Sequence, residues 1–220
     1  MIQNKIRRYD LIVFDLDGTL IDSKMDITAS VNFTLESLAL KPLPAATVTS
    51  FIGKGVKNLL MQSLGEGAQD KFGSAIKVFR RHYNEHCLDR TVLFPRVKET
   101  LKHLHGLSKA IVTNKPGMFT GPILKGLGIE TFFDFVLGGD EVPKKKPNPD
   151  PIFILLERFQ MKPDRVLMIG DSPLDIQMGK AAQIQTCAVT YGYGNKGDLI
   201  SEKPDFIIDN FFELLDKIKF

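Results

Sequence analysis

The sequence predicts an α/β protein with a doubly wound, Rossmann-like parallel sheet and an inserted small α-helical domain. Residues 11–14 are continuously apolar, which is typical of a strand that is buried on both faces of a parallel sheet. After residue 95, short apolar strands alternate with helical patterns, and this alternation is typical of right-handed crossovers in a parallel sheet. Residues 22–94 show helical periodicity and no strand pattern, so they are expected to form the helical insert.

The first core segment, residues 1–21, contains the first predicted strand over residues 9–14. This strand ends at the polar turn Asp15-Leu16-Asp17-Gly18-Thr19-Leu20. In the insert, residues 22–94, apolar positions at helical spacing predict three helices: residues 27–38, 56–64 and 72–87. We therefore expect a helical insert of about 70 residues between two parts of one core.

The second core segment, residues 95–220, supplies the remaining strands and their connecting helices. Strands are expected over residues 109–112, 135–137, 166–169, 186–189 and 206–208. Helices are expected over residues 97–104, 119–127, 152–159, 174–182 and 211–218. Gly106 and Gly128 end the first two of these helices. Six strands with flanking helices suffice to bury a sizeable core.

Composition excludes several classes of protein. The 220 residues are 43% hydrophobic, which argues against wholesale disorder, and the net charge of +3 provides no basic face for nucleic acid. No apolar run approaches the roughly 18 residues of a membrane span, and the N-terminus lacks signal-peptide features. Cys87 and Cys187 fit no metal spacing and are expected to be buried thiols. We therefore expect a cytoplasmic monomer or homodimer without a membrane or nucleic-acid partner.

Polar residues follow four predicted strands, at the point where each strand ends. Ligands of open α/β sheets bind beyond the carboxyl ends of the strands, so these residues are expected to share one edge. In chain order they are Asp15 and Asp17, Thr113-Asn114-Lys115, Gly138-Gly139-Asp140 with Lys144 to Lys146, and Gly170-Asp171-Ser172 with Asp175. The agreement of four strand ends predicts a functional site there.

Carboxylates that meet at one edge predict a divalent cation. Asp15 and Asp171 would repel each other unless a cation lay between them. Oxygen ligands without His or Cys favour Mg²⁺ over zinc or copper. A carboxylate such as Asp15 can act as a nucleophile, and Asp17 can protonate a leaving oxygen and later deprotonate water. The set predicts phosphoryl transfer through a covalent aspartate.

Four motifs resemble those of the haloacid dehalogenase-like hydrolase superfamily. They are, in order, Asp15-Leu16-Asp17-Gly18-Thr19-Leu20, Ile111-Val112-Thr113-Asn114, Lys146-Pro147 and Gly170-Asp171-Ser172-Pro173-Leu174-Asp175. A closer resemblance to phosphoglycolate phosphatases rests on the helical insert and on Thr113-Asn114-Lys115-Pro116, Lys146-Pro147-Asn148-Pro149 and Tyr191-Gly192-Tyr193. Pro95-Arg96-Val97 departs from the Pro-Gly-Val that relatives often have at the return from the insert.

The resemblance implies a role for each carboxylate of the motifs. Asp15 would be the nucleophile and a Mg²⁺ ligand. Asp17 would be the acid/base, with its backbone carbonyl on the metal. Asp171 would ligate Mg²⁺, and Asp175 would do so directly or through water.

The resemblance also assigns the phosphate-binding residues. Thr113 and Asn114 would hold phosphate oxygens, while Lys146 would offset the charge on Asp15 and on the phosphoryl group. Residues 22–94 would be a mobile cap that closes over the site. In that cap, Lys54 lies between two glycines and could meet an anionic substrate, or its segment could be a simple loop between helices.

Plainer interpretations compete at some of these positions. Ser172 and Asp175 have the spacing of a capping box, which explains Ser172 fully and Asp175 in part. His82 and His86 lie four residues apart, but no third ligand is apparent and solvent exposure is expected. His103 and His105 are also expected at the surface.

The function expected from the sequence is a Mg²⁺-dependent phosphatase of a small phosphorylated metabolite, with 2-phosphoglycolate as the leading substrate. A phosphosugar or pyrophosphate would use the same core, and a sugar phosphomutase would also use Asp15 and Asp17. A dehalogenase is disfavoured because that chemistry needs neither Mg²⁺ nor the second aspartate. A metabolite-binding regulator without activity is disfavoured because every motif residue is intact.

Overall fold

The computed structural model describes residues 8–218 and contains, within them, a six-stranded parallel sheet in the order β5-β4-β1-β6-β7-β8. The strands are β1 (Leu11–Phe14), β4 (Ser108–Val112), β5 (Phe135–Leu137), β6 (Val166–Gly170), β7 (Gln185–Val189) and β8 (Phe206–Ile208). The predicted fold class is confirmed, and each of these strands lies where the sequence predicts one. Residues 1–7 and 219–220 of the predicted core lie outside the described residues.

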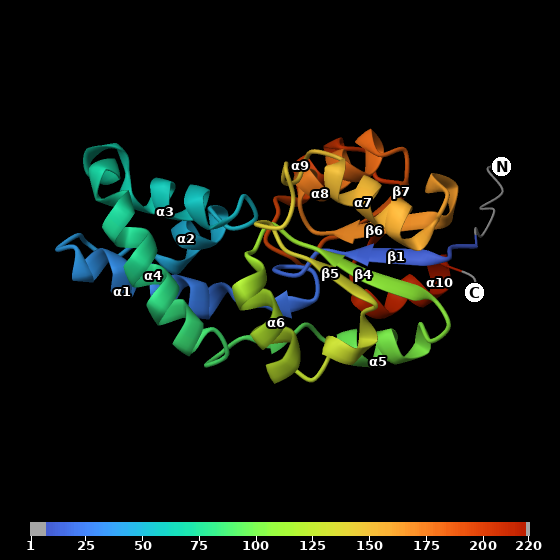
Figure 1. Ribbon diagram of the computed structural model, residues 1–220, viewed down its shortest axis with the longest axis horizontal. Helices are drawn as coiled ribbons and strands as arrows, with labels where there is room; N and C mark the ends of the chain where they lie inside the picture. The colour runs from blue at the N-terminus through green and yellow to red at the C-terminus, as the bar shows by residue number, and fades with distance from the viewer. Residues whose placement is uncertain (1–7, 219–220) are drawn as a thin grey trace.

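β1 is central because both of its faces are apolar. It pairs with β4 on one side and β6 on the other, with Leu11 opposite Ser108 and Val166. Ile12 and Phe14 pack into the cluster that contains residues of α5 (Val97–His103), α6 (Gly117–Gly126) and α10 (Leu214–Lys217). Leu11 and Val13 pack into the cluster of α7 (Asp150–Phe159) and α8 (Pro173–Ala181). Helices therefore cover both faces of the sheet (Figure 1).

The inserted segment forms a separate group of helices at one end of the molecule (Figure 1). Its helices are α1 (Lys24–Ser37), α2 (Ala45–Ser50), α3 (Val56–Leu64) and α4 (Phe72–His86). The three expected helices correspond to α1, α3 and α4. Neither α2 nor the 3₁₀ helix η1 (Glu66–Lys71) is predicted from the sequence, because six residues are too few to show helical periodicity.

Two short strands close the base of the insert, where no strand was expected. β2 (Ile21–Asp22) and β3 (Val92–Leu93) form an antiparallel pair with Ile21 opposite Leu93. The expectation of a purely helical insert is therefore wrong at its two ends. A strand of two residues cannot show the alternation from which strands are predicted.

In the Pro95-Arg96-Val97 junction, Arg96 occupies the position at which relatives often have glycine, and it adopts a turn conformation there. Arg96 has φ 64°, a left-handed conformation that favours glycine and costs another residue about 1–2 kcal/mol. Its guanidinium lies 3.3 Å from the centre of the Phe212 ring and is paired with Glu99. These contacts offset part of the strain, so the junction does without the glycine.

The remaining elements are short. They are α9 (Lys196–Ser201), which is not predicted from the sequence, and the 3₁₀ helices η2 (Glu130–Phe132), η3 (Pro163–Arg165) and η4 (Phe211–Glu213). Within residues 8–218, no helix has the length and apolarity that crossing a membrane requires. Cys87 and Cys187 are buried and unpaired with each other, as expected.

Candidate active site

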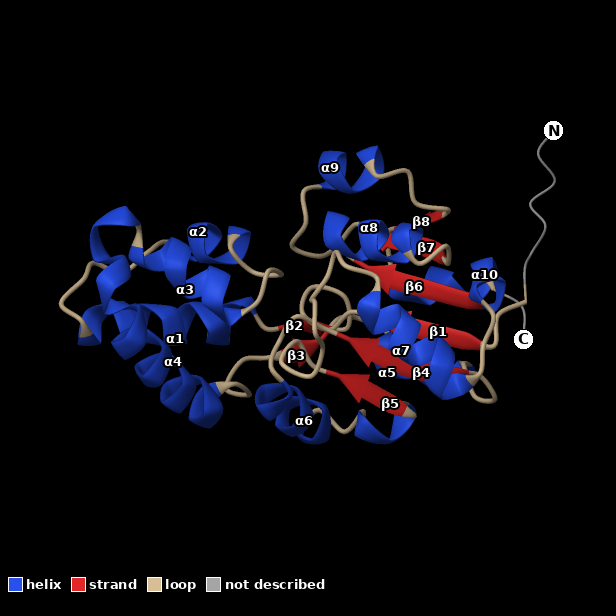
Figure 2. Ribbon diagram, turned by 45° about the horizontal axis from the view of Figure 1, so that its top comes forward, coloured by secondary structure: helices blue, strands red, loops and turns tan. Residues whose placement is uncertain are grey.

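The strands of the sheet run towards the helical insert, so their carboxyl ends face it (Figure 2). β1 ends beside Asp15, β4 ends beside Thr113, and β6 ends beside Asp171. Because these three strands are neighbours in the sheet, residues that are far apart in the sequence meet at one place. This is the edge at which the sequence predicts the site.

Three buried carboxylates form the centre of this edge. One oxygen each of Asp15, Asp171 and Asp175 lies within 4.8 Å of the others. Lys146 Nζ contacts Asp15 Oδ1 at 2.8 Å and Asp175 Oδ1 at 2.7 Å. One buried ammonium thus faces three buried carboxylates, and the excess negative charge and all-oxygen donor set fit a hard divalent cation such as Mg²⁺.

The crowding of charge changes the protonation of these groups. Burial, together with repulsion from Asp175 and Asp171, raises the pKa of Asp15 to about 8, although Lys146 acts in the opposite direction. Burial and Asp175 raise the pKa of Asp171 to about 6. Burial acts to lower the pKa of Lys146, but Asp15 and Asp175 raise it, so Lys146 stays cationic.

The Asp171 carboxylate is held by hydrogen bonds and by close packing against the backbone. Its Oδ1 accepts a hydrogen bond from Thr19 Oγ1 at 3.0 Å, and its Oδ2 accepts one from Tyr193 N at 2.7 Å. Gly18 has φ +88°, and a Cβ there would lie 2.3 Å from Asp171 Oδ2. Only glycine therefore fits this position of the first motif.

Asp175 takes part in both interactions that the sequence suggested. The capping box is present: Asp175 Oδ2 accepts hydrogen bonds from Ser172 N at 3.1 Å and Ser172 Oγ at 2.6 Å. Its other oxygen is bonded to Lys146. Asp175 thus fixes the start of α8 and orients Lys146 while lying within the carboxylate group.

Asp17 lies beside this centre and faces the insert. Lys115 Nζ contacts both of its carboxylate oxygens at 2.9 Å, and Ser23 Oγ donates a hydrogen bond to Oδ1. Burial acts to lower the pKa of Lys115, but Asp17 raises it. Lys115 Nζ also lies 4.8 Å from the centre of the Tyr83 ring on α4.

The predicted phosphate-binding residues differ in their surroundings. Thr113 and Asn114 are buried at the end of β4. Asn114 Nδ2 donates to the carbonyl oxygen of Gly53 in the insert at 2.8 Å, and its Oδ1 accepts from Lys146 N at 3.1 Å. Lys54 is exposed, whereas the glycines on either side of it line the pocket described next. A role for Lys54 stays a prediction.

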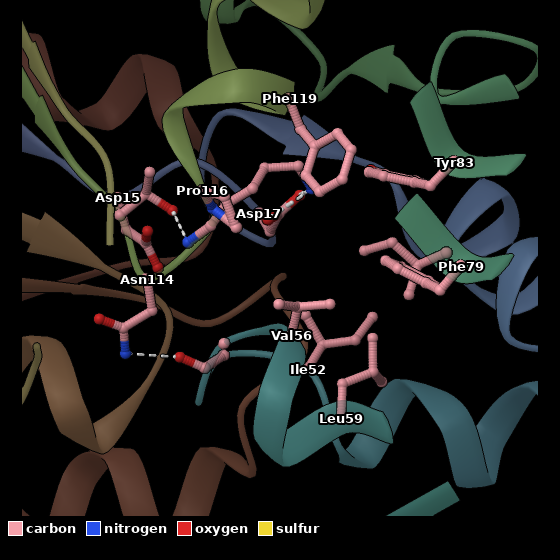
Figure 3. A pocket seen from close by; sticks show the side chains of 15 residues that line it. Asp15, Asp17, Ile52, Val56, Leu59, Phe79, Tyr83, Asn114, Pro116 and Phe119 are labelled. Carbon is pink, nitrogen blue, oxygen red and sulfur yellow. Dashed lines mark hydrogen bonds and ion pairs between the residues drawn. The ribbon is translucent and has the colours of Figure 1, made fainter. Parts of the chain in front are cut away.

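A pocket lies between the sheet edge and the insert, with Asp15 and Asp17 on one side (Figure 3). The opposite wall consists of apolar and aromatic side chains, namely Ile52, Val56, Leu59, Phe79, Tyr83 and Phe119 (Figure 3). The pocket thus presents two carboxylates at one end and a largely apolar surface at the other.

The chain matches the family described as haloacid dehalogenase-like hydrolase over residues 12–189. It belongs to this family. It is 38% identical to a phosphoglycolate phosphatase of Salmonella paratyphi A over 96% of the chain and 93% of the relative. It is 37% identical to that of Colwellia psychrerythraea, over 98% and 99% respectively.

A solved structure agrees with these relatives. A crystal structure of a predicted phosphoglycolate phosphatase from Haemophilus somnus matches with a TM-score of 0.90 and 35% identity, over 96% of this chain and 98% of that one. The resemblance to haloacid dehalogenase-like hydrolases, and the closer one to phosphoglycolate phosphatases, is therefore confirmed.

Two residues of this haloacid dehalogenase-like site were not assigned a role from the sequence. Lys115 directly follows the second motif, and this position at a strand end was a usable signal. Tyr83 carried no such signal, because its place in the apolar stripe of α4 is typical of a core residue.

His82 differs from its expected exposure. It is half-buried, its Nδ1 lies 2.9 Å from Ser30 Oγ, and its ring stacks on Phe33. Burial lowers the pKa of His82, and the neighbouring His86 adds to this effect. The helix face that carries His82 packs against α1, so the expectation of solvent exposure is wrong for this residue. His103 and His105 are exposed, as expected.

The raised carboxyl pKa values predict how stability depends on pH without metal. The folded protein holds protons on Asp15 up to about pH 8 and on Asp171 up to about pH 6, whereas the unfolded chain releases them near 3.8. Their contribution to the free energy of unfolding is present below about pH 4 and is lost as the pH rises to about 8. Urea unfolding in EDTA should therefore show stability falling between about pH 6 and pH 8.

Asp15→Asn is the matched variant for this experiment, since an amide does not titrate. It should show a smaller fall over the same pH range, and Mg²⁺ should stabilise the wild type more at the higher pH. Wild-type stability that rises over this range in EDTA, with the same slope in the variant, would contradict the prediction.

Proposed function

We propose that the protein is a Mg²⁺-dependent phosphatase that hydrolyses a small phosphate monoester, 2-phosphoglycolate above all, through a covalent intermediate on Asp15. The observation that carries the proposal is the convergence of Asp15, Asp171, Asp175 and Lys146 at the carboxyl edge of the sheet. The names of the relatives support the choice of 2-phosphoglycolate.

Asp15 is oriented for attack on phosphorus. Its Oδ1 accepts hydrogen bonds from Leu16 N at 2.7 Å and from Lys146 Nζ. Among residues 8–218 no group hydrogen-bonds to Oδ2, so this oxygen is free to form the bond to phosphorus. That bond forms as the bond from phosphorus to the leaving oxygen breaks.

Asp17 supplies the proton for the leaving oxygen and takes one from water in the second step. The water oxygen then bonds to phosphorus, the aspartyl bond breaks, and phosphate leaves with Asp15 restored. Lys115 and Ser23 hold the Asp17 carboxylate towards the pocket. Two pockets border Asp17, and the one that Lys115 also lines is the proposed place for the leaving group.

The groups around Asp15 would neutralise the transferred phosphoryl oxygens. Thr113, Asn114 and Lys146 would bind them from β4 and from the loop before α7. Mg²⁺, held by Asp15, Asp171 and the Asp17 backbone carbonyl, with Asp175 direct or through water, would offset the remaining negative charge.

The insert, residues 22–94, would act as the cap over a core made of residues 1–21 and 95–220. Its closure would exclude water from the phosphoryl group. The hydrogen bond from Asn114 to Gly53 joins the two parts directly above the site, which supports this role. The cytoplasmic location and the monomeric or homodimeric state stay predictions.

Phosphate release from a panel of substrates, with Mg²⁺ and with EDTA, tests the proposal. We expect release from 2-phosphoglycolate to exceed that from a sugar phosphate and from pyrophosphate, to stop in EDTA and to return when Mg²⁺ is added. A higher rate with a sugar phosphate or pyrophosphate would contradict the assignment of 2-phosphoglycolate as the substrate but not the assignment of the protein as a phosphatase. Undiminished release in EDTA would overturn the metal dependence.

A further inference from the structure

The leaving group of the proposed reaction has to lie close to Asp17, because the acid must be within about 3 Å of the leaving oxygen. Asp17 borders two pockets: a polar one lined by Thr49, Ser50 and Asn195, and the pocket between the sheet edge and the insert, which we assign to the leaving group. Most of its wall is apolar, formed by Ile52, Val56, Leu59, Phe79 and Phe119. An unpaired charge or hydroxyl group buried against such a wall costs free energy. The wall therefore disfavours a leaving group that carries several hydroxyl groups, such as a sugar.

Lys115 is the exception in this wall. Among the described residues that line the pocket it is the only one with a cationic side chain. An ammonium group has three N–H donors; the two oxygens of Asp17 engage up to two of them, and Lys115 also interacts with the Tyr83 hydroxyl. A second anion can bind Lys115 by replacing the Tyr83 oxygen as an acceptor while the contact with Asp17 is kept.

Tyr83 supplies a second polar group at the same place. Tyr83 is 1% exposed, and within residues 8–218 its hydroxyl interacts with the Lys115 ammonium but has no other polar partner. Burial raises the pKa of Tyr83, with Lys115 acting against this rise, so the hydroxyl keeps its proton and lies near the ammonium. The ammonium can only donate a hydrogen bond, so the Tyr83 O–H still lacks an acceptor, which a bound carboxylate would supply.

We propose that Lys115 and Tyr83 form a carboxylate subsite that selects phosphate monoesters whose leaving group carries a carboxylate one carbon away from the leaving oxygen. The inference rests on the proposed function and names the residues that would make the phosphatase selective for carboxylated substrates. Lys115 Nζ is 2.9 Å from Asp17, so an anion close to the leaving oxygen is within its reach. Since Tyr83 belongs to α4 and Lys115 follows β4, the carboxylate would also join the insert to the core.

A comparison of two substrates tests the subsite. 2-Phosphoglycolate and 2-hydroxyethyl phosphate are similar in size, but the second has a neutral hydroxymethyl group in place of the carboxylate. The wild type should favour 2-phosphoglycolate in kcat/KM, and Lys115→Met should reduce this preference by about 10- to 100-fold, the range for a lost hydrogen bond to a charged group. Tyr83→Phe should reduce it by about 5- to 10-fold.

The preference, not the rate, is the decisive quantity, because Lys115→Met also releases Asp17 and should slow both substrates. Lys57→Met, an exposed lysine on α3, is the matched control and should keep the wild-type preference. If Lys115→Met lowers kcat/KM equally for both substrates, the subsite proposal is wrong and Lys115 is only a positioning residue for Asp17. A loss of preference in Lys54→Met instead would assign charge selection to Lys54 and also overturn it.

A measurement on the wild type covers the case in which Lys115→Met does not fold. With 2-hydroxyethyl phosphate as substrate, glycolate should inhibit at a concentration at least about 10-fold lower than ethylene glycol does. Equal inhibition would overturn the subsite. Wild-type enzyme that releases phosphate from neither substrate would instead contradict the proposed function, so the two failures are distinguishable.

Discussion

Asp15→Asn is expected to lower kcat for phosphate release by on the order of 10⁴-fold, because the amide cannot form the proposed covalent intermediate. The same variant should unfold in EDTA at about pH 8 at a temperature at least as high as that of the wild type. Burial and the repulsion from Asp171 and Asp175 oppose the charge on Asp15, as its raised pKa shows. Loss of activity without loss of stability is therefore the expected signature of this residue.

Asp140→Asn is the matched control for this experiment. Asp140 is an exposed aspartate beyond the end of β5, and its Oδ1 accepts a hydrogen bond from Gly117 N. Its replacement should leave kcat within about threefold of wild type, since it lies outside the carboxylate group. Substantial turnover by Asp15→Asn would exclude the covalent mechanism, and a large drop in its melting temperature would show that Asp15 has a structural role.

Lys146→Met is expected to have the second-largest effect, and it should act on both activity and stability. The Lys146 side chain is 2% exposed and contacts Asp15 and Asp175, so its removal leaves buried carboxylates without a partner. Such a loss costs about 3–5 kcal/mol of unfolding free energy. The loss of charge stabilisation should lower kcat by about 10²- to 10³-fold.

Urea unfolding at about pH 8, with EDTA and with Mg²⁺, separates these two effects. Mg²⁺ should restore part of the stability of Lys146→Met, because a divalent cation replaces some of the lost positive charge, while kcat stays low. Lys144→Met, an exposed lysine in the same loop, should change stability by less than about 0.5 kcal/mol. A Lys146→Met variant as stable as the wild type in EDTA would show that the buried ion pairs contribute no net stability.

The predictability of the fold depended on the length of each apolar pattern. β1, β6 and α4 are long or apolar enough to be predicted from the sequence. The α2 and α9 helices and the β2–β3 pair were not predicted, because segments of two to six residues are too short to show helical or strand periodicity. The turn at Arg96 depends on Phe212, a residue more than a hundred positions away, and no local pattern contains that contact.

The candidate site was predictable to the extent that it follows strand ends. Asp15, Thr113 and Asp171 lie beside one another because they end neighbouring parallel strands. The double role of Asp175, which caps α8 and contacts Lys146, was only partly predictable, since the capping spacing shows in the sequence and the lysine contact does not. No spacing rule indicates the pairing of Asp17 with Lys115, which are 98 positions apart.

The sequence by itself determined which side chains stand at the ends of the central strands, because continuous apolar runs must be buried and polar residues follow them at one edge. From this came the carboxylate centre and the expected reaction, while the resemblance to haloacid dehalogenase-like hydrolases singled out Lys146. Only the tertiary structure decided what surrounds the leaving group, because Lys115 and Tyr83 belong to different parts of the chain. Their contact depends on how the amphipathic helix α4 packs over the sheet edge. Helical periodicity predicts that one face of α4 is buried, but it does not indicate which other element that face contacts.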